Sequence, residues 1–145
     1  MVNTEVHSGP YPCRSLAEVE RLIQDFESGL LLPDDFSHQA HLTVALWYFD
    51  RLPAPEAAER FRTGIRQLLA RHGINEYNET VTTFWLGLVH EFYIQGGAGR
   101  SFMDLVEGLT EKYGNSRLIF DYYSKALLSS AEAKERLVEP DLKPE

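Results

Sequence analysis

Residues 40–49 read AHLTVALWYF, and residues 81–92 read VTTFWLGLVHEF. Both stretches are apolar nearly all the way round a helix, which is typical of helices at the centre of a bundle. The rest of the chain places apolar residues at i, i+3, i+4 and i+7, the spacing of surface helices with one buried stripe. We therefore expect an all-α, compact, bundle-like single domain in which other helices cover two central ones.

Capping residues and breakers divide the chain into six to seven expected helices. Ser15 and Glu18 form a capping box ahead of a first helix that Gly29 stops. The second helix is expected to begin near Asp34 or Asp35 and to end at about Arg51. The following helices are expected from Pro55 to Gly73, from Asn78 to Gly96–Gly97, from Ser101, over about 117–128 and from Ser130. We expect residues 1–14 to form a loose leader and residues 139–145 an extended tail.

Composition narrows the class of protein. At 145 residues the chain fits one domain, and 22 acidic against 14 basic residues give a formal net charge of −8. An acidic chain without a basic cluster is repelled by nucleic acid and by anionic membranes. The first residues lack the pattern of a signal peptide, and no apolar stretch is long enough to span a bilayer. We expect a soluble, cytoplasmic protein, and its lone cysteine, Cys13, cannot form an internal disulfide.

Two histidines stand out beside the first apolar stretch. His38 and His41 are three residues apart, so on a helix their Cβ atoms lie roughly 5–6 Å apart on one face. Glu79, in the first turn of the other central helix, is the obvious carboxylate to complete a set of ligands. Two histidines and one carboxylate are a known set for catalytic zinc and for non-haem iron.

The sequence thus predicts a divalent metal site, zinc or iron, made by His38, His41 and Glu79. Tyr77 and Thr83 are close enough in sequence to line the same pocket, and Tyr48 is a further candidate for contact with a substrate. On this hypothesis the protein is a metal-binding protein or a metal-dependent enzyme that acts on a small molecule. The reaction is left open.

Two other interpretations remain beside the metal site. The histidines can belong to a metal-free pocket, walled by aromatic residues, that holds an apolar ligand or a partner helix. They can also be hydrogen-bonded core residues, with Glu79 contributing only to the helix dipole, in a structural domain that forms a homodimer. Since eleven residues of helix span roughly 16 Å, His90 cannot share one ion with Glu79.

Two weaker candidates complete the set. Residues 96–100, Gly-Gly-Ala-Gly-Arg, resemble a phosphate loop only superficially, because no strand precedes them and no Gly-Lys-Ser/Thr follows. Arg66 is expected to be solvated, although it has the chemistry to pair with a buried carboxylate.

Five blocks are spread along the chain: FSHQAHL at 36–42, ALWY at 45–48, YNETVT at 77–82, YYS at 122–124 and EPDL at 139–142. Together they resemble an uncharacterised family of small bacterial all-helical proteins. The resemblance implies that His38, His41 and Glu79 form a matched set, and it names no activity. Where the family pattern has a histidine within the tyrosine-x-glutamate-threonine block, this chain has Asn78, which can instead cap the helix.

Overall fold

The structure is a computed structural model that describes residues 11–96 and 99–144. These residues form helices and turns without a strand, which confirms the all-α class. In chain order the elements are α2 (Leu16–Ser28), the 3₁₀ turn η1 (Pro33–Asp35), α3 (His38–Arg51), α4 (Ala54–Arg71), α5 (Glu79–Gly96), α6 (Phe102–Tyr113), the 3₁₀ helix η2 (Ser116–Asp121), α7 (Lys125–Leu128) and α8 (Ala131–Glu135). No helix within the described ranges is long and apolar enough to cross a membrane.

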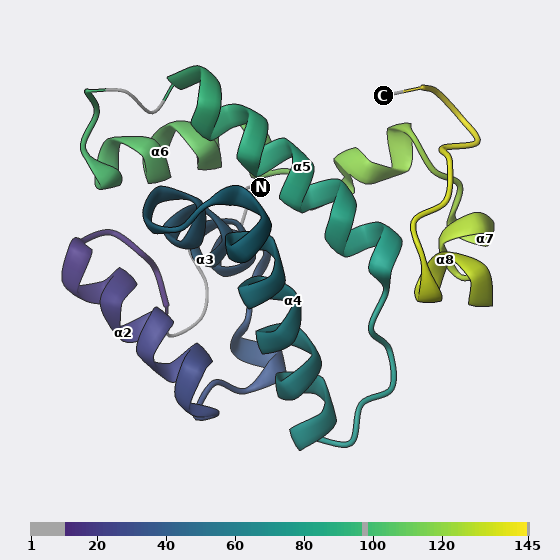
Figure 1. Cartoon of the computed structure of the whole chain (residues 1–145), viewed down its shortest axis with the longest axis horizontal. Helices are drawn as coiled ribbons and strands as arrows, with labels where there is room; N and C mark the ends of the chain where they lie inside the picture. Colours follow the sequence, from purple (N-terminus) through teal and green to yellow (C-terminus); the bar gives the residue numbers. More distant parts are fainter. Residues whose placement is uncertain (1–10, 97–98, 145) are drawn as a thin grey trace.

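The central position predicted for the two apolar stretches is confirmed. α3 packs against α2, α4, α5 and α6, and Figure 1 shows it enclosed among them. α5 packs against α3, α4, α6 and α8. Both helices bury residues on more than one face because they have neighbours on more than one side.

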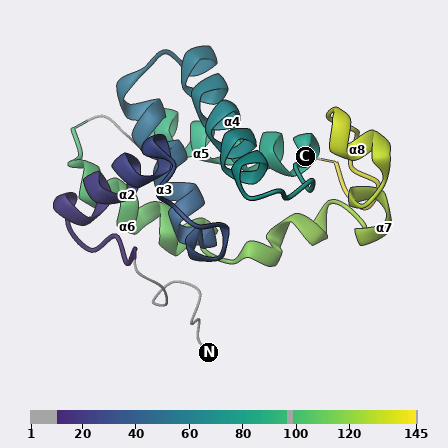
Figure 2. The same ribbon diagram turned by 90° about the horizontal axis from the view of Figure 1, so that it is seen from below.

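α5 takes part in two separate hydrophobic cores. Leu86 and Val89 belong to the main core around α3. Phe84 belongs to a smaller core that it forms with Ile119, Tyr123 and Leu128. In Figures 1 and 2, α7 and α8 lie at the opposite end of the molecule from α2. The C-terminal residues therefore form a small lobe that reaches the main core through α5.

A glycine permits the close approach of α2 and α4. A Cβ atom placed on Gly64, in the middle of α4, would lie 2.3 Å from two ring carbons of Phe26 on α2. That separation is far below van der Waals contact, so the Phe26 ring can lie against the backbone of α4 only where no side chain is present. Glycine is otherwise unfavourable at such a position.

Two helix boundaries differ from those expected. The expected start of the second helix at Asp34 or Asp35 is wrong, because these residues form η1 and Ser37 caps α3 instead, its Oγ accepting a hydrogen bond from the Ala40 amide at 3.2 Å. The helix expected over 117–128 is also wrong, since it is divided into η2 and α7. Ser124 starts the second piece by accepting from the Leu127 amide at 3.1 Å.

The C-terminal tail is held in place by a buried hydroxyl. Thr80, fully buried in the first turn of α5, donates a hydrogen bond to the Arg136 carbonyl at 2.9 Å and accepts one from the Val138 amide at 3.2 Å. Further along, Asp141 accepts from both the amide and the hydroxyl of Ser124. Residues 136–144 contain no helix, and they are fastened to α5 and to the start of α7.

The beginning of the described chain differs from the loose leader that we expected. Tyr11 and Cys13 are both buried, and the Tyr11 hydroxyl donates to Asp25 on α2 at 2.6 Å. Residues 1–10, including His7, lie outside the described residues.

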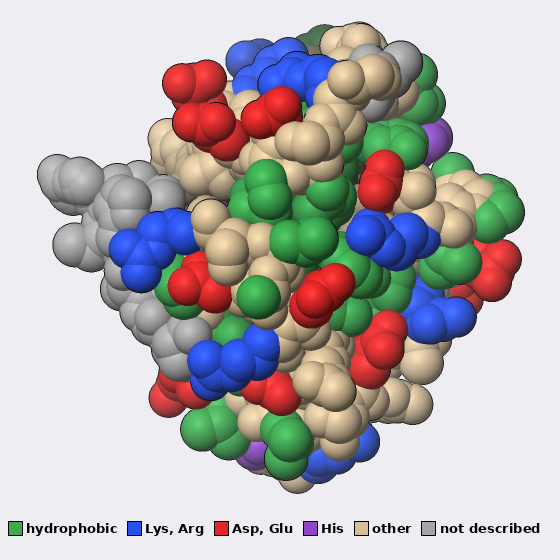
Figure 3. All heavy atoms as spheres, turned by 90° about the vertical axis from the view of Figure 1, so that its left-hand side faces the viewer, with side chains coloured by type: hydrophobic (Ala, Val, Ile, Leu, Met, Phe, Trp, Pro, Cys, Tyr) green, Lys and Arg blue, Asp and Glu red, His purple; other side chains and the backbone are tan. Residues whose placement is uncertain are grey.

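On the face shown in Figure 3, lysine and arginine side chains lie interspersed with acidic ones, and hydrophobic side chains gather between them.

Replacement of Thr80 by valine tests how the tail is held. The substitution keeps the shape of the side chain but leaves the Arg136 carbonyl and the Val138 amide without their partner, so we expect Thr80→Val to lower the free energy of unfolding by about 2 kcal/mol in urea titrations. Thr43→Val is the control, because the hydroxyl of buried Thr43 donates to the Gln39 carbonyl within its own helix. Equal losses in the two variants would contradict this role for Thr80.

Candidate functional site

A cavity of about 380 Å³ lies where the two hydrophobic cores meet. One wall comes from α3, α4 and α5, and the other from η2 and α7. We call it the histidine cavity because His38 and His41 line it. Its other lining residues are Leu42, Ala45, Phe61, Ile65, Val81, Thr82, Trp85, Leu86, Val89, Ser116, Ile119, Phe120 and Leu128.

His38 connects α3 with the end of α6. Its Nε2 lies 2.9 Å from the carbonyl oxygen of Tyr113, the last residue of α6. Since a carbonyl only accepts, the Nε2 atom carries the proton, and the bond satisfies one of the carbonyls that a helix end leaves without a partner. The imidazole also meets the Trp85 ring edge to face, with centroids 4.5 Å apart. His38 therefore has a packing role as well as a place on the cavity wall.

His41 is held by its own helix and by the neighbouring Phe36. Its Nδ1 lies 2.9 Å from the Ser37 carbonyl, and its ring stacks on Phe36 with centroids 3.8 Å apart. Its accessible surface faces the histidine cavity and an adjoining hollow of about 200 Å³. Burial lowers the pKa of His41 from 6.5 to about 4, against the raising effect of the Ser37 carbonyl, and His38 lowers it further. The imidazole is therefore neutral at pH 7.

Glu79 belongs to a different polar cluster. Arg62 Nε donates to Oε2 at 3.0 Å and Arg66 lies 3.6 Å from Oε1. Tyr77 donates to Oε1 at 2.5 Å and Thr83 to Oε2 at 2.9 Å. Burial opposes ionisation of Glu79, but these two hydroxyls and the two guanidinium groups outweigh it and lower the pKa of the carboxyl.

The structure thus brings the predicted residues together in two groups. His38 and His41 share the histidine cavity, whereas Glu79 is joined by Tyr77 and Thr83, which were predicted to lie with it, and is not among the residues that line the cavity. Within the described ranges, no three His, Cys, Asp or Glu side chains are grouped closely enough to hold one metal ion. The metal site remains a prediction, and it would require Glu79 to leave its arginine partners.

The other predicted candidates lie elsewhere. Tyr48 is buried and donates to Glu27 at 2.6 Å. His90 stacks on Phe49 with centroids 4.9 Å apart, and its neighbour Glu91 is exposed. Neither Tyr48 nor His90 is among the residues that line the histidine cavity.

Two weaker candidates are also placed. Arg66, expected to be solvated, is half exposed but pairs with Glu79 and lies over the Tyr77 ring, 4.7 Å from its centroid. The glycine-rich segment at 96–100 includes residues 97 and 98, which lie outside the described residues.

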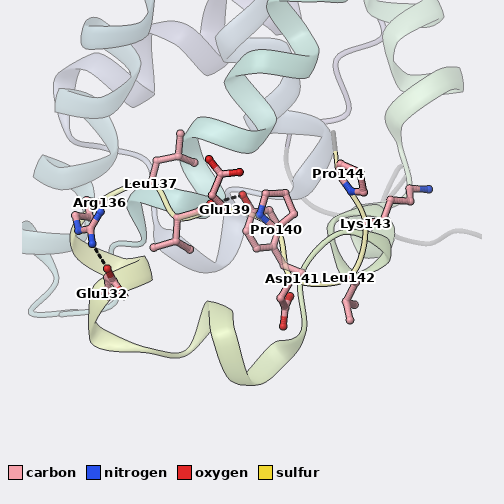
Figure 4. Close-up of a pocket in the computed structure, with 11 residues that line it drawn as sticks. Glu132, Arg136, Leu137, Glu139, Pro140, Asp141, Leu142, Lys143 and Pro144 are labelled. Carbon is pink, nitrogen blue, oxygen red and sulfur yellow. Dashed lines mark hydrogen bonds and ion pairs between the residues drawn. The ribbon is translucent and has the colours of Figure 1, made fainter.

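Two further hollows are larger but offer less chemistry. One, of about 820 Å³, is lined mostly by the exposed tail from Arg136 to Pro144, with the Glu132–Arg136 ion pair at its edge (Figure 4). The other, of about 520 Å³, is lined by Cys13 among mostly polar residues. Burial raises the pKa of the Cys13 thiol to about 11, so it is protonated at pH 7 and is a poor nucleophile. The histidine cavity is the better candidate site.

Reasoning from the sequence missed most of the cavity wall. The wall follows two helical stripes: residues 38, 41, 42 and 45 on α3, and residues 81, 82, 85, 86 and 89 on α5. Positions i+4 and i+7 from His38 are residues 42 and 45, so helical spacing alone would have found the first stripe. Arg62, the partner of Glu79, and Ser116 on the opposite wall carry no local signal.

No family model, curated protein or solved structure matches the chain. The resemblance to the bacterial family stays a prediction. The function must therefore be inferred from the site.

The neutral state of His41 makes stability depend on pH. Its pKa is about 4 in the folded chain and about 6.5 in the unfolded one, so between these values the unfolded chain takes up a proton that the folded chain does not. As pH falls from 6.5 towards 4, His41 should therefore reduce the free energy of unfolding by up to about 3 kcal/mol. Denaturant titrations across this range should show a shallower loss in His41→Gln.

His72→Gln is the matched control for this measurement. His72 is an exposed histidine whose Nδ1 also bonds the carbonyl four residues earlier, that of Leu68, at 3.0 Å. The control should keep the wild-type dependence on pH. A His41→Gln variant that loses stability as steeply as the wild type would show that His41 does not stay neutral.

Proposed function

We propose that this protein binds a small, mainly apolar molecule in the histidine cavity. The observation that carries the proposal is the combination of lining and size: eleven of the fifteen lining residues are apolar or aromatic, and the volume is about 380 Å³. Sites for small molecules are typically apolar hollows of about 300–1,000 Å³ with a few polar groups. Here His38, His41, Thr82 and Ser116 supply those groups.

The position of the cavity supports a binding role. The histidine cavity is partly open to solvent, so a ligand can enter it. An apolar ligand there would displace water from the apolar wall and remove its own apolar surface from water. The ligand would contact α5 and both cores at once.

Filling the cavity from its wall tests the proposal. Naphthalene is a suitable probe, because a cavity of about 150 Å³ already holds benzene. We expect one equivalent of naphthalene to bind in calorimetry, and Ala45→Leu, which adds three carbons at a buried lining position, to weaken binding roughly tenfold.

Ala58→Leu is the control, since Ala58 packs on the main core without lining the cavity. It should bind naphthalene as the wild type does. No binding up to the solubility of naphthalene, or equal binding by Ala45→Leu and Ala58→Leu when both are folded, would refute the proposal.

A metal ion is the second candidate occupant. It is favoured by one observation: both histidines line the same cavity, and each has one ring nitrogen bonded to a backbone carbonyl, as metal-binding histidines commonly do. The metal hypothesis predicts about one equivalent of zinc or iron in protein purified without a histidine tag, lost in His41→Ala and kept in His72→Ala. A metal content of only a few hundredths of an equivalent in the wild-type protein would rule out the metal hypothesis.

A further inference from the structure

The protonation of His41 is fixed by its backbone partner. The Ser37 carbonyl, 2.9 Å from Nδ1, can only accept a hydrogen bond, so Nδ1 carries the proton of the neutral ring. The other ring nitrogen, Nε2, then presents a lone pair. His41 can therefore accept a hydrogen bond at Nε2, and it cannot donate one there without becoming charged.

That lone pair is accessible from the hollows. No hydrogen bond joins Nε2 to a described residue. Among described side chains, every nitrogen or oxygen that is cut off from solvent has a partner, so Nε2 is not cut off. Because His41 lines both the histidine cavity and the adjoining hollow, the accessible side of its ring faces this space.

The surroundings disfavour a charged ligand. None of the described residues that line the histidine cavity is Asp, Glu, Lys or Arg. The adjoining hollow adds one charged side chain, the acidic Glu76. An anion would thus be desolvated without a cation to compensate it, and a cation would meet the same environment that keeps His41 unprotonated.

We infer that the ligand is a neutral molecule with a flat apolar body and one O–H or N–H group, which donates a hydrogen bond to His41 Nε2. This inference rests on the proposed function and narrows it to a ligand class typified by phenols and aromatic alcohols. Trp85, Phe61 and Phe120 line the same cavity and offer flat surfaces for such a body.

Three probes of one shape test the inference. 2-Naphthol carries the donor, 2-methylnaphthalene replaces it with a methyl group, and 2-naphthoate replaces it with an anion. We expect calorimetry at pH 7 to give 2-naphthol the lowest Kd, about three- to tenfold below that of 2-methylnaphthalene, as one net hydrogen bond provides. 2-Naphthoate should bind most weakly of the three.

His41→Leu should abolish the preference for 2-naphthol while retaining 2-methylnaphthalene. The same substitution at the exposed histidine, His72→Leu, should leave the preference unchanged. If His41→Leu does not fold, ¹⁵N NMR of the wild type supplies the test: 2-naphthol should shift the His41 Nε2 resonance towards the protonated range, and 2-methylnaphthalene should not.

Each of the remaining outcomes would overturn one specific step of the inference or of the proposed function. Equal affinities for 2-naphthol and 2-methylnaphthalene, or tightest binding of 2-naphthoate, would overturn the inference and leave the proposed function standing. Failure of all three probes to bind would overturn the proposed function itself. A preference for 2-naphthol that survives His41→Leu would show that His41 is not the acceptor.

Discussion

α5 has to satisfy two hydrophobic cores at once. Leu86 and Val89 pack into the main core and Phe84 into the smaller one, and in the described part of the chain α7 and α8 make no extensive contact with α3 or α4. Residues packed in or on both cores line the histidine cavity, and Val81, Trp85 and Val89 of α5 belong to its wall. The site therefore lies where the two lobes share one helix.

Polar groups around the cavity are positioned by helix ends. Ser37 caps α3 through its hydroxyl, and its carbonyl holds His41 in one tautomer. Because His38 is the first residue of α3, it can reach the last carbonyl of α6. These hydrogen bonds orient each imidazole within an apolar wall, and preorganised groups of this kind favour specific binding since the ligand does not have to order them.

Local signals predicted the fold well and the site only in part. Caps such as Ser15, Asn78 and Ser101 act within one turn, so they could be recognised in the sequence. The start of α3 was misplaced because Asp34 and Asp35, which lie in η1, meet the same capping criteria as Ser37. Glu79 was assigned to the histidines because nothing local reveals Arg62, which reaches it from another helix.

Diffraction from crystals under xenon pressure would show whether an apolar cavity lies between the two cores beside His41. Xenon enters apolar cavities and is readily located by its electron density. We predict xenon in contact with Ile65, Val89 and Ile119, from α4, α5 and η2. A structure in which Trp85 and Phe120 close this space and no xenon is bound there would show that the protein has no such cavity.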